Sequence, residues 1–304
     1  MSVKTTLFLF FSFTLIISCS KKGEKIVTGN VPKNYENVST VKVENYINRL
    51  YIDLLGREPL DTENDRDLGF LRGGNLSYDT RKLLITRLMT DSIFVPGDSS
   101  YKRAYYQRIY DLTKARLVEG AEEGEFYGQA GNAAFALRSS RLLGDSIGVF
   151  QAMETIDKCL NVPRSRRRYQ VGEITINKMY AAMLNNPIYD QINMNSLNFV
   201  NASFDDMFFR FPTRDEFTIA YDIIESSKPG SLFTGYAGNK AEYCAMLVNS
   251  KEFSEGIIKW CYLSLIGREP NTQETFNLVK DFYATQNLQK IQTQILITDE
   301  YAHF

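Results

Sequence analysis

The sequence has little of the chemistry on which most catalytic and metal sites depend. Histidine occurs once, as the penultimate residue His303, and chain ends fray. The four cysteines are Cys19, Cys159, Cys244 and Cys261, and no two of them form a Cys-x-x-Cys motif. Histidine-based acid–base catalysis and the common zinc sites, which need several His or Cys ligands, are therefore nearly excluded.

Other functional motifs are missing too. The sequence contains no glycine-rich phosphate loop, nucleophile elbow or paired-histidine motif, so we predict neither a cofactor nor a metal. It also lacks alternating β-branched runs bounded by hairpin turns. Apolar residues make up 44% and aromatic residues 13% of the chain, which is ample for a packed core. We predict an all-α, multi-helix fold. The formal charge of −1 gives no case for a nucleic-acid partner.

The N-terminus is typical of a secretory signal. Lys4 precedes an apolar run from Leu7 to Ile17, which is too short and wrongly flanked for a spanning helix. The run ends in Ile-Ile-Ser-Cys19, which resembles the lipobox of bacterial lipoproteins. This resemblance implies cleavage after Ser18 and acylation of Cys19 with fatty acids such as palmitate. Several acyl chains on one cysteine give stable membrane anchoring.

The residues after Cys19 bear on the location of the protein. Ser20 at the next position resembles the pattern that sorts lipoproteins to the outer membrane. The acidic tract that resembles a surface-export signal in Bacteroidetes-type lipoproteins is missing, which slightly favours the periplasmic leaflet over the cell surface. Residues 20–42 are polar and contain Gly23, Gly29 and Pro32, so we expect a flexible tether.

One motif occurs three times in the rest of the chain. Tyr46–Pro59 ends in Leu-Leu-Gly-Arg-Glu-Pro, and Ile257–Pro270 ends in Leu-Ile-Gly-Arg-Glu-Pro. A more diverged copy, Phe204–Pro212, keeps an aromatic residue, the apolar pair, the arginine and the proline. The aromatic residue and the apolar pair are spaced i, i+3, i+4, which predicts one face of a helix. Glycine suits the C-terminus of that helix, and proline stops it.

A second helix is expected after each proline. Thr213-x-x-Glu216 is a capping box, and Asn271-x-x-Glu274 is a relaxed version of it. In the first copy Leu60 occupies the cap position, so we expect Asp61 to take that role. A unit of this kind cannot bury its own apolar faces, so we expect the copies to pack on each other or on the middle of the chain. After a further apolar helix the copies end alike, in Thr90-Asp-Ser-Ile-Phe94, Asn249-Ser-Lys-Glu-Phe253 and Thr298-Asp-Glu-Tyr301.

The arginine two residues before each proline has two interpretations. It binds an anion, or it forms a joint by bonding the free carbonyls at the helix end and the glutamate four residues past the proline. The recurrence of both residues in all copies favours the joint. Its residues are Arg57, Glu63, Arg210, Glu216, Arg268 and Glu274.

The motif Leu50-Tyr-Ile-Asp-Leu-Leu-Gly-Arg-Glu-Pro59 resembles small helical domains of unknown function in secreted and envelope bacterial proteins. It also resembles those of planctomycete cytochrome-associated proteins and, more distantly, phycobilisome linker domains. The resemblance covers residues 44–94 and 200–304, implies a helical fold and carries no established activity. The haem motif Cys-x-x-Cys-His, which sometimes accompanies the planctomycete proteins, is absent.

The repeats divide the chain into parts. We assign residues 1–18 to a lipoprotein signal peptide and residues 19–42 to an acylated tether. A first helical repeat (43–94), a helical middle region (95–200) and repeats two and three (201–304) follow. In the middle region we expect Ala130–Leu143 to form a helix packed closely against another.

Two features of the middle region have a functional and a structural interpretation. Pro163-Arg-Ser-Arg-Arg-Arg168 is expected on a loop at a helix break. We favour a solvated turn facing Glu119–Glu125 over contact with lipid phosphates or an acidic partner. A tyrosine-rich helix over residues 101–112 is expected to be core, although its tyrosines are candidates for a sugar-stacking platform. The arginines concerned are Arg164, Arg166, Arg167 and Arg168, and the tyrosines are Tyr101, Tyr105, Tyr106 and Tyr110.

The sequence therefore favours a non-enzymatic outer-membrane lipoprotein, anchored through Cys19, that acts as an accessory or scaffold subunit and binds a protein partner. A glycan- or peptidoglycan-binding lipoprotein that uses exposed tyrosines is the alternative. A hydrolase with a carboxylate pair comes third, and Asp205, Asp206 and Glu216 are its nearest candidates. Cys244 and Cys261 are expected to be buried small hydrophobes, with a disulfide between them as the alternative.

Overall fold

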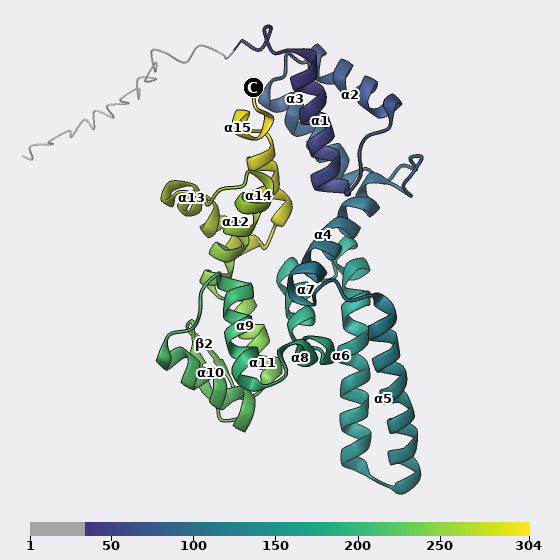
Figure 1. The fold of residues 1–304 in the computed structure, drawn as a ribbon, viewed down its shortest axis with the longest axis vertical. Coiled ribbons are helices and arrows are strands. Elements are labelled where there is room, and N and C mark those ends of the chain that lie inside the picture. The colour runs from purple at the N-terminus through teal and green to yellow at the C-terminus, as the bar shows by residue number, and fades with distance from the viewer. Residues whose placement is uncertain (1–33) are drawn as a thin grey trace, which may run out of the picture. The chain divides into compact units, whose positions relative to one another are not determined.

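The computed structural model describes residues 34–304 (Figure 1). The signal peptide (1–18), Cys19 and most of the tether (19–42) lie outside the described residues. From Tyr35 onward the chain forms one unit, and this part contains fifteen helices and a single two-stranded hairpin, so the all-α prediction is confirmed. Within residues 34–304, none of the helices combines the length and the apolar character needed to span a bilayer.

The elements follow one another as α1 (Thr40–Leu55), α2 (Asp61–Gly73), α3 (Tyr78–Thr90), α4 (Tyr101–Leu117), α5 (Glu123–Leu143), α6 (Ser146–Gln170), α7 (Ile176–Leu184), α8 (Pro187–Asn193), α9 (Ser196–Phe208), α10 (Arg214–Ser226), β1 (Gly230–Leu232), β2 (Gly235–Ala237), α11 (Lys240–Val248), α12 (Lys251–Leu265), α13 (Thr272–Thr285), α14 (Leu288–Leu296) and α15 (Asp299–Ala302). The strands β1 and β2 are antiparallel, with Ser231 opposite Tyr236.

Each copy of the motif begins with a helix that ends at a turn containing the Arg-x-Pro sequence. We call this turn, with the ion pair that its arginine forms, the corner of the copy. This helix is α1 in the first copy, α9 in the second and α12 in the third. A capped helix follows in each case, namely α2, α10 or α13, and then α3, α11 or α14. The last residues of the second copy, Asn249–Phe253, include the N-cap Ser250 and the first turn of α12. Helix α12 therefore belongs to two copies, as the helix that follows the second and the helix that opens the third.

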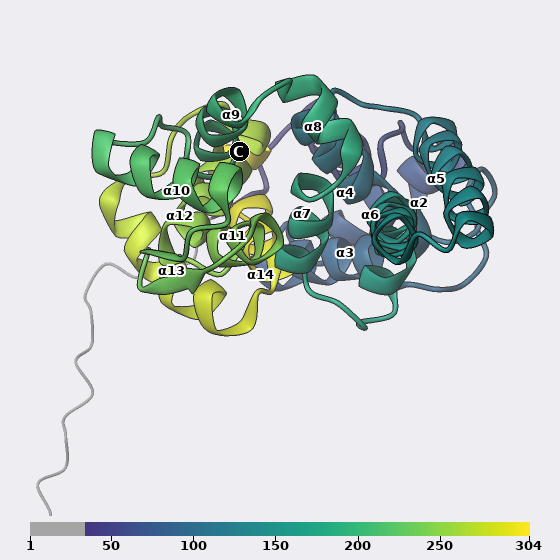
Figure 2. The ribbon, with the colours of Figure 1, turned by 90° about the horizontal axis from the view of Figure 1, so that it is seen from below.

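The copies and the middle region share one hydrophobic core. Buried side chains form a single cluster that runs from Tyr35 to Ala302. Helix α12 approaches α9 so closely that a Cβ on Gly256 would lie 2.1 Å from the carbonyl oxygen of Met207. At the other end of the core, the ring of Phe304 lies 5.4 Å from that of Tyr46 in α1. The copies thus pack on each other and on the middle, as the repeat pattern predicts. Figure 2 shows α9–α14 grouped beside α2–α8.

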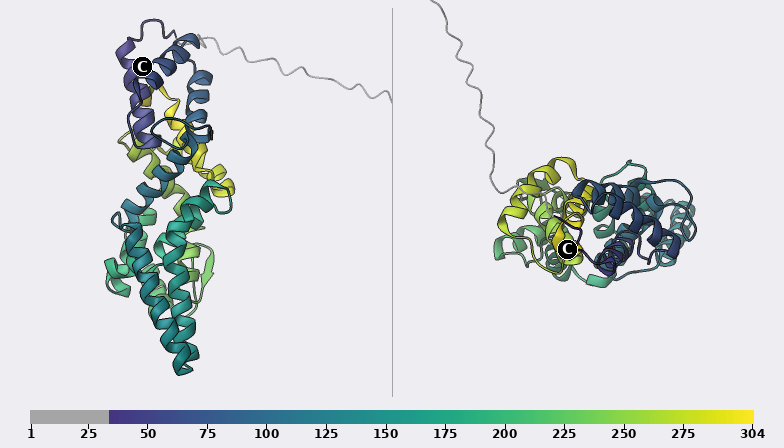
Figure 3. Two further views of the ribbon diagram at one scale, coloured as in Figure 1. Left: turned by 90° about the vertical axis from the view of Figure 1, so that its right-hand side faces the viewer. Right: turned by 90° about the horizontal axis from the view of Figure 1, so that it is seen from above.

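The middle region contains a long helical hairpin. Helices α5 and α6 lie side by side and extend beyond the other helices (Figures 1 and 3). The turn between them places Gly144 at φ +70°, and the Asp145 carboxylate accepts the Gly148 N–H at 3.0 Å. Ala130 and Ala133 are buried in α5, which fits the prediction of a small-residue helix in close contact with a neighbour.

Two local predictions are wrong. The expected break at Pro163 lies inside α6, because Val162, Pro163 and Tyr169 are buried in one face and their burial offsets the hydrogen bond that proline removes. In the first copy Phe94 is 74% exposed, whereas its supposed equivalents Phe253 and Tyr301 are fully buried. The chain passes through an extra loop there, and Ser100 caps the helix α4 that follows.

A third expectation concerns the cap of α2. Asp61 is the first residue of this helix and Leu60 is its N-cap, so Asp61 does not take the cap role. The Leu60 N–H instead donates to the Glu63 carboxylate at 2.8 Å. Of the two hydrogen bonds of a capping box, only the one from the N-cap backbone to Glu63 is therefore present. It is sufficient to keep the cap in its extended conformation without a capping side chain.

Candidate functional site

The three Arg-x-Pro corners share one backbone geometry. The residue before each corner arginine is left-handed: Gly56 at φ +77°, Phe209 at φ +57° and Gly267 at φ +80°. Glycine adopts this conformation without strain, whereas phenylalanine does so at a cost. The Phe209 ring is covered by the Arg116 guanidinium, whose centre lies 4.1 Å from the ring centroid. Contacts around the ring therefore hold the strained corner of the second copy.

At each corner the arginine forms a two-pronged ion pair with the glutamate six residues later. The two N···O distances are 2.7 and 2.9 Å for Arg57–Glu63. They are 2.8 and 2.7 Å for Arg210–Glu216, and 2.9 and 2.8 Å for Arg268–Glu274. Each glutamate also accepts the backbone N–H of its own helix cap, at 2.7–2.8 Å. The pair thus fixes the angle between two helices, because both partners are tied to the backbone.

A second acid and a ring complete each corner. Asp98, Glu252 and Glu300 each bind the matching arginine from a later segment of the chain. The guanidinium lies over the aromatic ring six residues earlier, at 5.2–5.4 Å from the centroid. Each arginine also donates one hydrogen bond to a backbone carbonyl. This carbonyl belongs to the residue that follows the arginine, not to the end of the preceding helix as we expected. The rings belong to Tyr51, Phe204 and Tyr262.

This arrangement leaves the arginines little capacity to bind a ligand. Every nitrogen of the Arg57 guanidinium bonds within the first corner, to Asp98, Glu58 or Glu63. In the second corner, the bonds from Arg210 hold the pKa of the Glu216 carboxyl low, at about 2. A carboxylate held ionised in this way is a poor proton donor or acceptor near neutral pH. The corner chemistry is that of a structural joint.

A second polar contact distinguishes the first two copies from the third. Asp53 and Asp206 both lie six residues before the corner proline, and each accepts a tyrosine hydroxyl at 2.7 Å, from Tyr301 and Tyr189 respectively. Burial raises the pKa of Asp206 to about 6, against the opposing effects of Tyr189 and Arg116. Ser264 occupies this position in the third copy.

The carboxylates proposed for a hydrolase have separate partners. Glu216 is bound by Arg210, and Asp206 accepts from Tyr189. Asp205 is exposed on α9. Within residues 34–304 no group of three or more His, Cys, Asp or Glu side chains is placed to hold a metal ion. These contacts tie Glu216 to the corner of its own copy and Asp206 to helix α8 of the middle region.

The four arginines of the segment Pro163–Arg168 are spread around α6. Arg166 donates to Gln107 and lies 3.9 Å from Glu123, so one of the four arginines faces the acidic stretch as we expected. Arg168 lies on another side, where its Nη1 donates to Asn161 at 3.2 Å. Arg164 and Arg167 are exposed. Positions 164–168 cover more than one full turn of α6, so their side chains point to different sides and do not form a single patch.

The tyrosines named for sugar binding are not accessible. Tyr101, Tyr105 and Tyr110 are at most 1% exposed, and Tyr106 is 9% exposed. Among their hydroxyls, Tyr101 donates to Glu63 at 2.6 Å and Tyr105 to Gln292 at 2.6 Å. The tyrosines are part of the core, as the favoured interpretation predicts. The alternative, a sugar-stacking platform, is wrong because these rings are buried.

The cysteines of the described part are buried thiols. Cys159, Cys244 and Cys261 are free, so the alternative of a disulfide between Cys244 and Cys261 is wrong for this structure. Burial raises the pKa of the Cys244 thiol to about 12, which keeps it protonated. These residues pack as small hydrophobes.

The end of the α5–α6 hairpin carries an unusual set of exposed apolar side chains. Single exposed apolar residues are common, but a group of them on one structural element marks an interaction surface. The hairpin tip cluster, as we name it, consists of Phe135, Leu142, Leu143, Ile147 and Phe150, which are between 69% and 82% exposed. No sequence pattern pointed to it, because the same residues fit a buried helix.

The comparisons with known proteins add no assignment. No protein-family model, no curated protein and no solved structure matches the chain. The resemblance drawn from the Leu-Gly-Arg-x-Pro motif therefore stays a prediction, and function has to be argued from the geometry of the chain itself.

Proposed function

We propose that the protein is a non-enzymatic accessory subunit of an outer-membrane assembly, tethered through an acylated Cys19, which presents the α5–α6 hairpin to a protein partner. The observation that carries the proposal is the hairpin tip cluster. The five members of this cluster lie on two helices packed against each other, so a partner that covers them gains apolar burial with little loss of entropy.

The polarity of the turn favours a protein over a lipid bilayer as the binding surface. The residues at the very end of the hairpin are Gly144, Asp145 and Ser146, and the Asp145 carboxylate caps α6. Insertion of the tip into hydrocarbon would bury this charge at a cost of several kcal/mol. The sides of the helices, where Phe135, Leu142 and Phe150 lie, are better suited to a hydrophobic groove on a protein.

Co-purification tests the partner surface. The full-length chain with a C-terminal tag is purified from detergent-solubilised envelopes of its native host, and co-eluting proteins are identified by mass spectrometry. The variant Phe135→Ser/Leu142→Ser/Phe150→Ser is expected to lose the partner while it keeps the wild-type circular dichroism spectrum. The matched control Phe276→Ser removes an apolar side chain that is 72% exposed on α13 and is expected to keep the partner. Equal recovery of the same proteins by all three would refute the proposal.

The lipid anchor has a separate test. Cells are grown with labelled palmitate and fractionated. The wild-type chain is expected to carry label and to sediment with outer membranes, whereas Cys19→Ser is expected to carry none and to be released. An unlabelled wild-type chain would refute the lipid anchor, whereas the proposed partner surface on the hairpin would be unaffected.

A further inference from the structure

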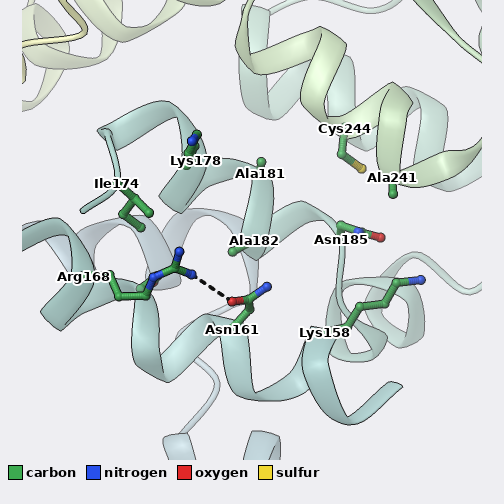
Figure 4. A pocket seen from close by; sticks show the side chains of 11 residues that line it. Lys158, Asn161, Arg168, Ile174, Lys178, Ala181, Ala182, Asn185, Ala241 and Cys244 are labelled. Carbon is green, nitrogen blue, oxygen red and sulfur yellow. Dashed lines mark hydrogen bonds between the residues drawn. The ribbon is translucent and has the colours of Figure 1, made fainter. Parts of the chain in front are cut away.

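We infer that a recess between α6, α7 and α11 binds a phosphate monoester group. The recess has a volume of about 240 Å³ and is distinct from the corners and from the hairpin tip cluster. Figure 4 shows side chains from three elements around one space: Arg168 and Asn161 from α6, Lys178 from α7, and Cys244 from α11.

The lining is cationic. Lys158, Arg168 and Lys178 contribute to it, and none of the described residues that line it is Asp or Glu. Lys158 pairs with Glu154 at 2.8 Å and Arg168 with Glu173 at 3.4 Å, but these acids lie outside the lining and are 46% and 61% exposed. Lys178 forms no ion pair with any residue of 34–304. Three like charges around one space repel each other, so an anion placed among them is favoured.

The bonds that hold Arg168 are easily exchanged. Its Nη1 donates to Asn161 at 3.2 Å, at the long end of the hydrogen-bond range, and its Nε contact with Glu173, at 3.4 Å, is an ion pair without a short hydrogen bond. A guanidinium binds phosphate oxygens in a two-pronged geometry, and a lysine supplies a mobile point charge. Arg168 together with Lys178 therefore offers the donors that a doubly charged phosphate takes.

The carbonyls at the end of α7, beside the recess, are partly bonded already, which weakens their opposition to an anion. The C-terminus of α7 would repel negative charge through its free carbonyls. Two of these carbonyls, those of Ala182 and Met183, already accept the side-chain amide of Asn186, at 3.2 and 2.7 Å. The methyl groups of Ala181, Ala182 and Ala241 form an apolar wall that suits the organic part of an ester.

Binding of two phosphate monoesters tests the site. Glucose 6-phosphate represents a free small molecule and is titrated by calorimetry, with glucose as the uncharged control. Vesicles that contain phosphatidic acid represent a lipid headgroup and are tested by co-sedimentation, with phosphatidylcholine vesicles as the control. We expect saturable binding to one or both phosphate probes and to neither control. Binding to the sugar phosphate alone assigns a soluble ligand, and binding to the vesicles alone assigns a lipid.

Charge variants connect the binding to the recess. Arg168→Gln/Lys178→Gln is expected to weaken binding at least tenfold. The matched control Arg164→Gln/Arg167→Gln removes the same charge from exposed positions of α6 and is expected to change it less than twofold. Affinity is also expected to rise between pH 5 and pH 7.5, because the second phosphate proton leaves near pH 6. Absence of saturable binding to both probes, or equal losses in the two variants, would overturn the assignment.

Discussion

The corners and the α5–α6 hairpin differ in whether their side chains have partners within the chain. In each corner every charge has a partner inside the unit, as in the set Arg57, Glu63 and Asp98. At the hairpin tip the large apolar side chains are left open to solvent, and Leu143 is 82% exposed. The bonds within a corner stabilise the fold, whereas the exposed apolar side chains of the hairpin add little to it and are the basis of the partner surface that we propose. This contrast separates structural from functional residues more clearly than any single motif.

The largest expected effect distinguishes the two regions by stability. Arg57→Ala removes the ion-pair partner of Glu63, whose side chain is only 6% exposed, and leaves its buried charge with only the hydrogen bonds from Leu60 and Tyr101. We expect a loss of about 3 kcal/mol in the free energy of unfolding, measured by urea denaturation. Phe135→Ser on the hairpin is expected to change it by less than about 0.5 kcal/mol.

The third corner provides a graded control for this prediction. The Arg268 side chain is 36% exposed, and Glu274 is 26% exposed, so solvent screens their pair. Arg268→Ala is expected to cost about 1 kcal/mol. A loss as large as that of Arg57→Ala would show that burial does not set the strength of the corners.

Two glycine-to-alanine substitutions, one in the packed core and one on the hairpin, are expected to change the free energy of unfolding in opposite directions. Gly256→Ala places a methyl group against the Met207 carbonyl, where the backbone of α9 has to move, and we expect a loss of about 2 kcal/mol. Gly128 lies in α5, and a methyl group added there would meet no other atom within 4 Å. Gly128→Ala is therefore expected to gain up to about 1 kcal/mol from helix propensity. Thermal unfolding of both variants measures the difference, and the same sign for both would contradict it.

The last prediction concerns the dependence of stability on pH. The pKa of Asp206 is raised from 3.8 to about 6, so its folded form holds a proton that the unfolded form has lost. Its contribution to stability is present below about pH 4 and is lost as the pH rises through 6. Asp206→Asn is expected to be more stable than the wild type at pH 8 by about 1 kcal/mol and not at pH 4. Urea denaturation at both values tests this, and an equal difference at the two would refute it.

Local chemistry explains why part of the structure could be predicted. The spacing of Arg210, Pro212 and Glu216 is fixed by a turn and one helical cap, so a sequence motif contains the ion pair at the centre of the corner. The second acid could not be found in this way. Glu252 and Asp98 lie about forty residues after their arginines, at positions set by how the helices pack.

Tertiary burial explains the failures. Pro163 is a helix breaker by local rules, but the core face that contains Val162 and Tyr169 carries α6 through it. The hairpin tip cluster and the recess have no motif either. Lys158 and Lys178 are brought together only by the contact between α6 and α7, and whether Phe135 faces protein or solvent depends on which helix lies opposite.

The double membership of α12 has a consequence for the dynamics of the chain. A fluctuation that frees this helix takes Glu252 from one arginine and Tyr262 from another at the same moment. Amide hydrogens of α9–α14 are therefore expected to exchange through a common opening, while those near Gly144 exchange independently. The second and third copies have no seam between them, so a truncation that removes either copy removes a helix of the other.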